Sequence, residues 1–270
     1  MTHARVTVIM PTLENRSEKL ERATASVRAQ TFSRWELFII HNDGPRERWF
    51  QAATGGVVHI RLGQPHPTPG HWNRLLGGLL AATEFVAYLD DDNMWRPRHL
   101  EVLVRALDDH PECGFAYSKM QYMESDARSG QVLGDGMVDA TGAVNHIDAS
   151  MIVHRTELLR DVATWDPHSA PPDLRYALDG YVVQKWLDAG VNYAWVDETT
   201  VDYSGIGYSL DGGAALAAIQ SAYDGHTAYS DEVKDQPTWV PASTVIDGRE
   251  MPWREGDVAM LNPDRHDGAE

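Results

Sequence analysis

The sequence is short of cysteine, of basic residues and of long apolar runs, and each shortage excludes a class of protein. Cys113 is the single cysteine, so an internal disulfide framework is excluded and a reducing compartment is expected. The 23 lysines and arginines stand against 40 acidic residues, a net charge of −17 that disfavours nucleic acid as a partner. No apolar run approaches the length of a membrane span and no signal-peptide core is apparent. We therefore expect a cytoplasmic protein without an integral membrane segment.

What the chain does contain is enough apolar material for a folded core. Hydrophobic residues make up 43% of the 270 positions, and there are nine tryptophans. This composition is typical of a globular protein and not of a disordered one. The length alone leaves one or two domains open.

Short apolar runs alternate with amphipathic stretches, which predicts an α/β fold. In the first hundred residues we expect strands over 5–10, 35–40, 57–62 and 85–89, and helices over 17–30, 72–80 and 97–107. Farther along we expect strands over 114–123, 132–139, 150–153 and 191–196, and helices over 156–162, 178–189 and 213–223. Strand, helix and strand over 5–40 predict a βαβ unit with a parallel strand pair. Ligands of such open sheets bind outside the carboxyl ends of the strands.

Three consecutive carboxylates, Asp90, Asp91 and Asp92, follow the apolar run over 85–89. Burying them unpaired would be costly, so a cation is expected beside them. Alternate residues of an extended segment face the same way, so Asp90 and Asp92 can converge on one ion. Oxygen ligands favour Mg²⁺ or Mn²⁺. The alternative is an acidic turn that caps the next helix.

The order and spacing of several stretches resemble one family, the inverting glycosyltransferases of the GT-A fold and of the family 2 type. The stretches are Val6–Thr12 with Asn15 and Arg16, Arg28–Phe32, Trp35–Ile40, Leu89–Asn93 with Trp95 and Pro97, Met151–Arg155, and Leu178–Tyr181. The resemblance covers about 5–205. It implies a Rossmann-like open mixed sheet flanked by helices, with a GT-A catalytic domain over 1–205 and a C-terminal extension over 206–270. The domain would divide into a nucleotide-sugar half, about 1–100, and an acceptor half, 101–205.

The resemblance also implies an activity: a sugar moves from a nucleoside-diphosphate donor to an acceptor hydroxyl with inversion, assisted by Mn²⁺ or Mg²⁺. Asp179 would be the general base. A DXD motif would supply the metal ligands Asp92 and Asp90. The nucleotide would be bound by Thr12, Asn42, Asp43, Arg74, Asp90 and Asp91. The acceptor, a small molecule or a saccharide, would lie near His154 and near Trp165, whose ring is suited to stacking on a sugar.

Each of these residues also has an ordinary structural interpretation. Asp179 can be a helix N-cap, the segment Asn42–Gly44 a plain turn, and His154 a packing residue. Arg74 can be a surface ion-pair partner. The segment His41–Asp43 stands where the family usually shows two acidic residues, so the nucleotide is left open.

Two rival functions are compatible with the same fold class. A non-catalytic module could bind the nucleotide sugar without turnover. A sugar-phosphate nucleotidyltransferase is less compatible, because it needs a glycine-rich loop after the first strand and Pro11–Asn15 contains no glycine. The extension over 206–270 could be a lid or a homodimer contact, and the sequence does not choose between them.

Overall fold

The structure is a computed structural model of the 270-residue chain. It describes residues 3–12, 17–42, 50–53, 56–61, 70–123, 129–136, 144, 147–161, 165–166, 178–204, 244–246 and 249–251. Asp43 and the helix predicted over 213–223 lie outside the described residues.

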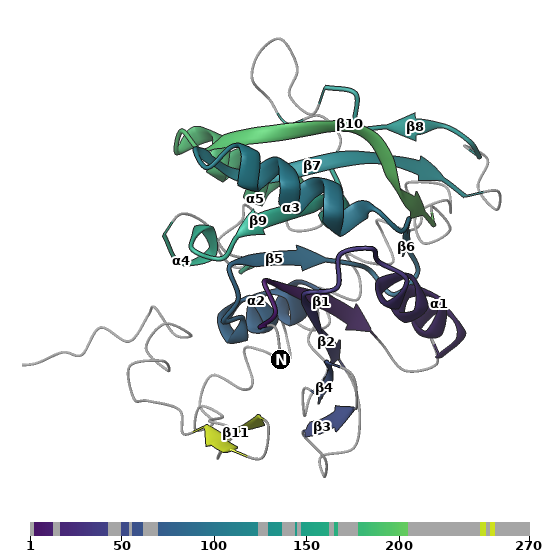
Figure 1. Cartoon of the computed structure of the whole chain (residues 1–270), viewed down its shortest axis with the longest axis vertical. Coiled ribbons are helices and arrows are strands. Elements are labelled where there is room, and N and C mark those ends of the chain that lie inside the picture. The colour runs from purple at the N-terminus through teal and green to yellow at the C-terminus, as the bar shows by residue number, and fades with distance from the viewer. Residues whose placement is uncertain are drawn as a thin grey trace, which may run out of the picture.

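A mixed sheet forms the centre of the molecule (Figure 1). Its strands are β1 Val6–Thr12, β2 Trp35–His41, β3 Phe50–Ala53, β4 Val57–Arg61, β5 Phe85–Tyr88, β6 Met94–Trp95, β7 Cys113–Tyr122, β8 Val132–Leu133, β9 Ile152–Arg155 and β10 Asn192–Tyr203. Within the described residues their order is β3-β4-β2-β1-β5-β9-β7-β10-β6, with β8 beside β7. A separate ribbon is formed by β11 Thr244–Ile246 and β12 Arg249–Met251.

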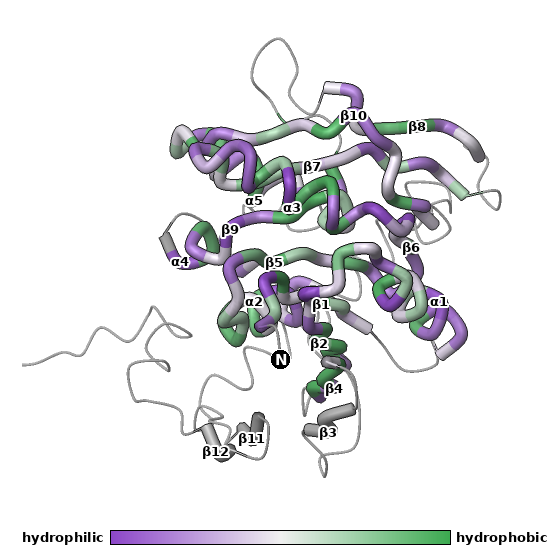
Figure 2. The backbone as a smooth tube through the Cα atoms, viewed as in Figure 1, coloured by the Kyte–Doolittle hydropathy of each residue, from purple (hydrophilic) through white to green (hydrophobic). Residues whose placement is uncertain are grey.

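Helices flank this sheet. They are α1 Ser17–Arg28, α2 His71–Leu80, α3 His99–Asp109, the 3₁₀ turn η1 Ala149–Met151, α4 Leu158–Asp161 and α5 Leu178–Asp188. Helix α3 shows how the sequence selects a buried face, because Leu100, Leu103, Val104 and Leu107 recur at helical spacing and are all buried. These residues turn toward β7 and β10, and polar residues cover the other side of the helix (Figure 2).

The predicted βαβ unit is present. β1 and β2 pair in parallel with Val6 opposite Trp35, and β5 and β4 extend the parallel part on either side. β9 then pairs antiparallel with both β5 and β7. As a result, the segment before β9 lies at the same sheet edge as the carboxyl ends of β1, β2 and β5. This edge is called the site edge below.

The first strand is longer than predicted, because Pro11 does not end it. β1 continues to Thr12, and Pro11 lies opposite Ile40 of β2. The backbone of Ile9 faces β5, because its carbonyl accepts from the N–H of Leu89. Pro11 lies two residues farther along the strand, so its backbone nitrogen faces the same side. β5 itself has ended at Tyr88, opposite Ile9. The missing N–H of proline therefore faces a position where no strand partner needs it.

Other boundaries differ because tertiary pairing overrides local pattern. Of the predicted strand over 132–139, the structure describes 132–136, and within these residues only Val132–Leu133 is a strand, followed by Gly134 with a φ of 104°. β10 runs past its predicted end to Tyr203, since its pairing with β7 continues through register shifts. The strand expected over 150–153 begins as η1, and β3 was not predicted at all.

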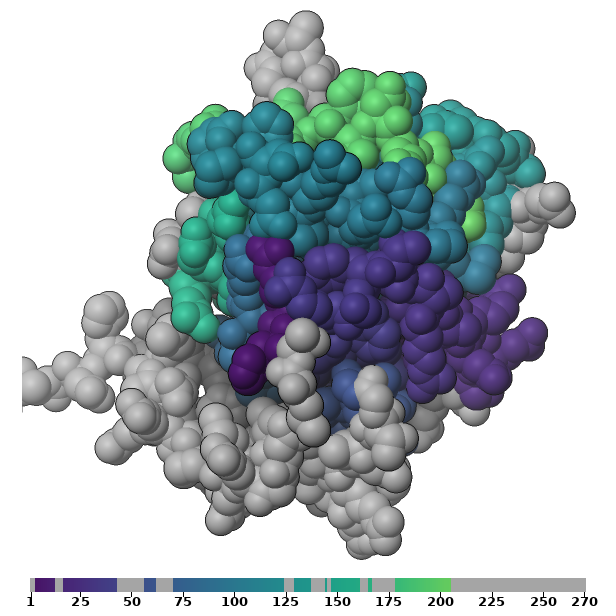
Figure 3. Space-filling model, in the orientation of Figure 1, coloured from purple at the N-terminus to yellow at the C-terminus, as the bar shows by residue number. Residues whose placement is uncertain are grey.

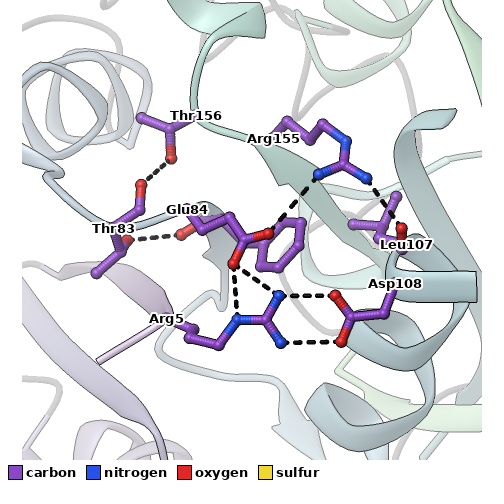
Figure 4. A network of polar contacts seen from close by, with 8 residues as sticks. Arg5, Thr83, Glu84, Leu107, Asp108, Arg155 and Thr156 are labelled. Carbon is purple, nitrogen blue, oxygen red and sulfur yellow. Dashed lines mark hydrogen bonds and ion pairs between the residues drawn. The ribbon is translucent and has the colours of Figure 1, made fainter. Parts of the chain in front are cut away.

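Side-chain contacts away from the site edge join distant segments of the chain. At the edge opposite the site edge, Arg5 donates to Glu84 over 2.7 Å and to both oxygens of Asp108 over 2.6 and 2.8 Å, and Arg155 approaches Glu84 to 3.8 Å (Figure 4). In the space-filling view the segment with α1 lies against the segment with α3 (Figure 3). There the side chain of Gln30 accepts from the backbone N–H of Leu100 over 2.9 Å.

Candidate active site

The first two aspartates of the predicted cation site are bound by neighbouring elements. Asp91 accepts a 2.7 Å hydrogen bond from the Thr12 hydroxyl, which joins the end of β1 to the loop after β5. Asp90 forms an ion pair with Arg74 of α2. These contacts place Thr12, Arg74, Asp90 and Asp91 together at the site edge, and their role in nucleotide binding stays a prediction.

Asp92 points to a different partner. Its carboxylate lies 3.4 Å from the ammonium of Lys19 on α1, and 16% of its side chain is exposed. The side chain of Asp90 is 29% exposed. Both carboxylates therefore reach the surface of the site edge, where a ligand could approach them.

The loop after β5 is held in place from the second half of the chain. Asn93 donates to the Ser150 hydroxyl over 2.9 Å and accepts from the Ser204 backbone over 2.9 Å. The indole of Trp95 donates to the Ser150 carbonyl over 2.8 Å. Because Ser150 belongs to η1, this turn and the aspartate loop form one connected unit.

Arg74 is the buried cation of the site. It is 5% exposed, and its guanidinium lies 5.2 Å from the centre of the Trp165 ring. Burial by itself would lower the pKa of Arg74, but the carboxylates of Asp90, Asp179 and Asp148 raise it above its ordinary value. Arg74 is therefore charged throughout the physiological range, and it is not the surface residue that one interpretation of the sequence allowed.

Asp179, the predicted general base, lies beside η1 at the site edge and belongs to the predicted acceptor half. It lies in the first turn of α5, and its Oδ2 accepts from the backbone N–H of Ala149 over 3.1 Å. The hydroxyl of the adjacent Ser150 lies 3.4 Å from the Asp90 N–H, so Asp179 and the aspartate loop meet at η1.

The sequence analysis missed Asp148. This half-buried residue precedes η1, and its Oδ1 accepts from the Ser150 N–H over 2.8 Å. Burial raises the pKa of the Asp148 carboxyl, and the nearby charges of Asp90 and Asp179 raise it further. An aspartate two residues before a serine is a common capping pattern, so its sequence signal pointed to a turn and not to a site.

The turn after β2, which is predicted to contact the nucleotide, is described only as far as Asn42. Asn42 is 2% exposed, and its N–H donates to the Thr12 carbonyl over 2.9 Å. The ring of His41 lies 3.0 Å, nitrogen to nitrogen, from the ring of His59. Burial, together with the charge of Arg61, lowers the pKa of His41 to about 4, so this pair is neutral near pH 7.

His154 and Trp165 lie inside the protein, and both are fully buried. His154 donates from Nδ1 to the Arg155 carbonyl over 2.7 Å, which leaves its Nε2 to accept from the Tyr88 hydroxyl over 2.8 Å. Burial lowers the pKa of His154 to about 4. Trp165 packs edge-on against Tyr88 at 4.9 Å. A fully buried ring exposes no surface on which a sugar could stack. In this structure His154 and Trp165 therefore pack inside the protein, with Trp165 against Arg74, and do not contact an acceptor.

The carboxylates at the site edge fit a divalent cation that is bound by one or two protein ligands together with water and phosphate oxygens. Among the described residues, no three or more His, Cys, Asp or Glu side chains are arranged to enclose a metal ion by themselves. Mg²⁺ and Mn²⁺ sites in nucleotide enzymes commonly use one or two carboxylates and complete their shell with water and phosphate oxygens. The partly exposed Asp90 and Asp92 suit this second type of site.

An open mixed α/β sheet flanked by helices, with acidic side chains from both halves of the chain at one edge, places this protein in the GT-A class of α/β folds. The sequence model of this class that matches the chain is "Glycosyl transferase family 2", over residues 7–142, which is half of the chain. The chain belongs to glycosyltransferase family 2.

Curated relatives match shorter parts of their own sequences. The protein CgeD of Bacillus subtilis is 26% identical over 171 residues, 57% of this chain and 39% of CgeD. The succinoglycan biosynthesis protein ExoW of Rhizobium meliloti is 34% identical over 104 residues, 36% of this chain and 32% of ExoW. The matched part thus spans less than half the length of either relative.

Solved structures agree on the fold. S. aureus TarS 1–349 superposes with a TM-score of 0.56 at 14% identity, over 86% of this chain and 75% of that chain. The mannosyltransferase PcManGT of Pyrobaculum calidifontis, solved with GDP-Man and Mn²⁺, superposes with a TM-score of 0.56 at 15% identity, over 89% of this chain and 67% of that chain. The predicted GT-A fold, an open mixed sheet flanked by helices, is confirmed. No described helix has both the length and the apolar character that crossing a bilayer requires.

Proposed function

We propose that this chain transfers a glycosyl group from a nucleoside-diphosphate sugar to an acceptor hydroxyl, with inversion at the sugar carbon. One observation carries the proposal. The backbone N–H of Asp90 lies 3.4 Å from the Ser150 hydroxyl, and the N–H of the adjacent Ala149 is donated to Asp179, so the two aspartates are held on either side of the turn η1. Donor and acceptor groups could therefore meet at a single point of the site edge.

On the donor side, the proposed roles follow from position. Thr12 and Asn42, which are hydrogen-bonded at the ends of β1 and β2, would form the floor of the nucleoside site. Asp91, fixed by Thr12, would accept from the ribose. Arg74 would neutralise part of the diphosphate charge, since its Nε is buried and has no hydrogen-bond partner among the described residues.

The transfer poses a proton problem and a charge problem. The acceptor hydroxyl must lose its proton as it attacks, and Asp179 would accept it, a contribution of about 10²–10⁴-fold. The leaving diphosphate gains negative charge, which Arg74 would stabilise. A divalent Mn²⁺ or Mg²⁺ held by Asp90 and Asp92 would supply Lewis-acid stabilisation of the same leaving group. One base and one displacement suffice for inversion.

The donor nucleotide is not chosen by these residues. TarS has been solved with UDP-GlcNAc and PcManGT with GDP-Man. In this chain the neutral pair of His41 and His59 stands at the end of β2, so the carboxylate contact to the base that the family pattern suggests would fall to Asp43, outside the described residues. We propose a small-molecule or saccharide acceptor and a cytoplasmic location.

A thermal-shift screen of UDP, GDP and dTDP, each with and without Mn²⁺, tests the donor site. A ligand that binds the native state raises the melting temperature as its concentration exceeds its dissociation constant. We expect one nucleotide to stabilise the protein, and to do so more strongly with Mn²⁺. The matching nucleotide sugar should then be turned over by the parent and not by Asp179→Asn. Binding without turnover in both proteins would identify a non-catalytic module, and no binding at all would refute the proposal.

A further inference from the structure

The turn η1 connects the two halves of the site through hydrogen bonds. On one side, Ser150 receives the Asn93 amide at its hydroxyl and the Trp95 indole at its carbonyl. On the other side, the N–H of Ala149 is donated to Asp179. Two consecutive residues thus contact the aspartate loop and the proposed base, so the position of η1 sets the spacing between them.

Asp148 closes this turn. Its backbone is extended, with φ −120° and ψ 145°, and its carboxylate accepts the Ser150 N–H over 2.8 Å. Its own N–H is donated to the sulfur of Met151 over 3.4 Å, which completes a capping box around η1. A turn of three residues has few internal hydrogen bonds, so this cap accounts for much of what fixes its shape.

The direction of the Ala149 N–H therefore depends on the Asp148 cap. A backbone N–H that points at a carboxylate oxygen fixes the rotation of that carboxylate, and Asp179 must present its other oxygen to the acceptor if it is to take a proton. Misplacement of a reacting group by about 1 Å can cost on the order of 10²-fold in rate. The cap is thus in a position to control turnover without touching the donor.

We propose that Asp148 is a positioning residue for the general base: by capping η1 it holds the Ala149 N–H at Asp179 and Ser150 at the aspartate loop. This inference rests on the proposed function. It assigns to Asp148 a role that acts through η1 and not through direct contact with the substrate.

Two substitutions of Asp148 separate the cap from the charge. Asp148→Ala removes the acceptor for the Ser150 N–H. Asp148→Asn keeps an oxygen at the same place and is an equally good cap. With the donor identified by the thermal-shift screen, we expect Asp148→Ala to lower kcat by about 10- to 100-fold with a donor KM within about threefold of the parent. Asp148→Asn should retain kcat within about threefold.

A third substitution tests the link to Asp179 alone. Ala149→Pro removes the N–H donated to Asp179, while the extended backbone of Asp148 is the conformation that a residue before proline prefers. Proline is also tolerated at the first position of a helical turn. We expect Ala149→Pro to lower kcat as Asp148→Ala does, again with donor binding retained. This variant keeps the test valid should Asp148→Ala fold poorly.

The matched control is Asp108→Ala at the opposite sheet edge, where Asp108 pairs with Arg5 (Figure 4). It removes a hydrogen-bonded carboxylate far from η1, so it should lower the melting temperature and leave kcat unchanged. A second readout is hydrogen exchange over 148–153. Exchange should rise in Asp148→Ala and remain near the parent value in Asp148→Asn and Asp108→Ala.

Each result decides the inference. Parental kcat in Asp148→Ala or in Ala149→Pro would overturn it. Equal loss in Asp148→Asn and Asp148→Ala would also overturn it, since the carboxylate itself and not the cap would then be required. If the parent binds and turns over no nucleotide sugar, the proposed function fails, and unchanged exchange over 148–153 in Asp148→Ala would separately refute the structural role of the cap.

Discussion

Arg74 and Asp90 form an ion pair between α2 and the end of β5, and the guanidinium is almost fully buried while the carboxylate is partly exposed. The carboxylates of Asp148 and Asp179, which come from later segments of the chain, also raise the pKa of this guanidinium. A cation shared in this way has consequences for both stability and catalysis.

Removal of Arg74 should be strongly destabilising. Arg74→Ala leaves neighbouring carboxylates without their cation, and breaking a buried pair from one side costs about 3–5 kcal/mol. The partial exposure of Asp90 favours the lower end of this range. Urea unfolding of the parent and the variant measures the difference. The control is Arg105→Ala on α3, whose pair with Asp109 is exposed and should contribute less than about 0.5 kcal/mol. Equal losses in the two variants would contradict the burial argument.

Replacement of the proposed base should affect turnover and not binding. Asp179→Asn keeps the shape of the side chain and can still accept the Ala149 N–H, but it cannot take a proton near pH 7. We expect kcat to fall by about 10²–10⁴-fold with the donor-induced thermal shift unchanged. Asp188→Asn, at the far end of the same helix, should retain full activity. If Asp179→Asn transfers sugar at the parental rate, another group is the base.

Metal dependence should be lost at Asp92. Asp92→Ala removes one of the two proposed metal ligands, so the nucleoside diphosphate should no longer stabilise the protein more in Mn²⁺ than in EDTA. The measurement is the difference in melting temperature between these two conditions. Asp135→Ala, a surface carboxylate paired with Lys119, serves as the control and should keep the Mn²⁺ effect. A persistent Mn²⁺ effect in Asp92→Ala would place the metal elsewhere.

Acid should destabilise the protein through its buried histidines. Burial lowers the pKa of His99 to about 3 and that of His154 to about 4, below the ordinary value of about 6.5 that the unfolded chain retains. The unfolded state therefore binds more protons as the pH falls. The stability that these neutral histidines provide is complete above about pH 6.5 and is lost progressively as the pH falls to about 4 for His154 and about 3 for His99, at about 2 kcal/mol each between pH 7 and pH 5.

Urea unfolding at several pH values tests this expectation. His99→Gln should flatten the loss of stability between pH 7 and pH 5, whatever its effect at pH 7. The control is His110→Gln, because the His110 side chain is 59% exposed. If His99→Gln and the parent lose stability equally on acidification, then His99 does not titrate upon unfolding as proposed.

Much of the donor side could be predicted from the sequence, since it depends on local pattern. The first strand, predicted over 5–10 and extended to Thr12 in the structure, its parallel pairing with β2 and the placement of polar residues after each strand follow from periodicity and from the handedness of βαβ units. The contact between Thr12 and Asp91 is a direct result of that arrangement. The rule that parallel strands present their carboxyl ends at the same sheet edge was sufficient to predict that these polar residues lie close together.

The acceptor side could not be predicted in the same detail, because its contacts join segments that no local pattern relates. The raised pKa of Asp148 comes from burial and from the charges of Asp90 and Asp179, which lie in other elements. In the sequence, Trp165 is a residue of the type that stacks on sugars. Only the tertiary packing shows that Arg74 of α2 covers its ring. The domain boundary expected near residue 205 and the role of the extension over 206–270 stay predictions.

The antiparallel strand β9 lies between β5 and β7 and pairs with both. One continuous backbone ladder therefore runs from β1 and β5 to β7 and β10. Rotation of one half against the other, as in hinged two-lobed enzymes, would require these interstrand hydrogen bonds to break. In the proposed transfer, opening and closing around substrates would then fall to surface loops, while the aspartate loop after β5 and η1 before β9 would keep the spacing of adjacent strands.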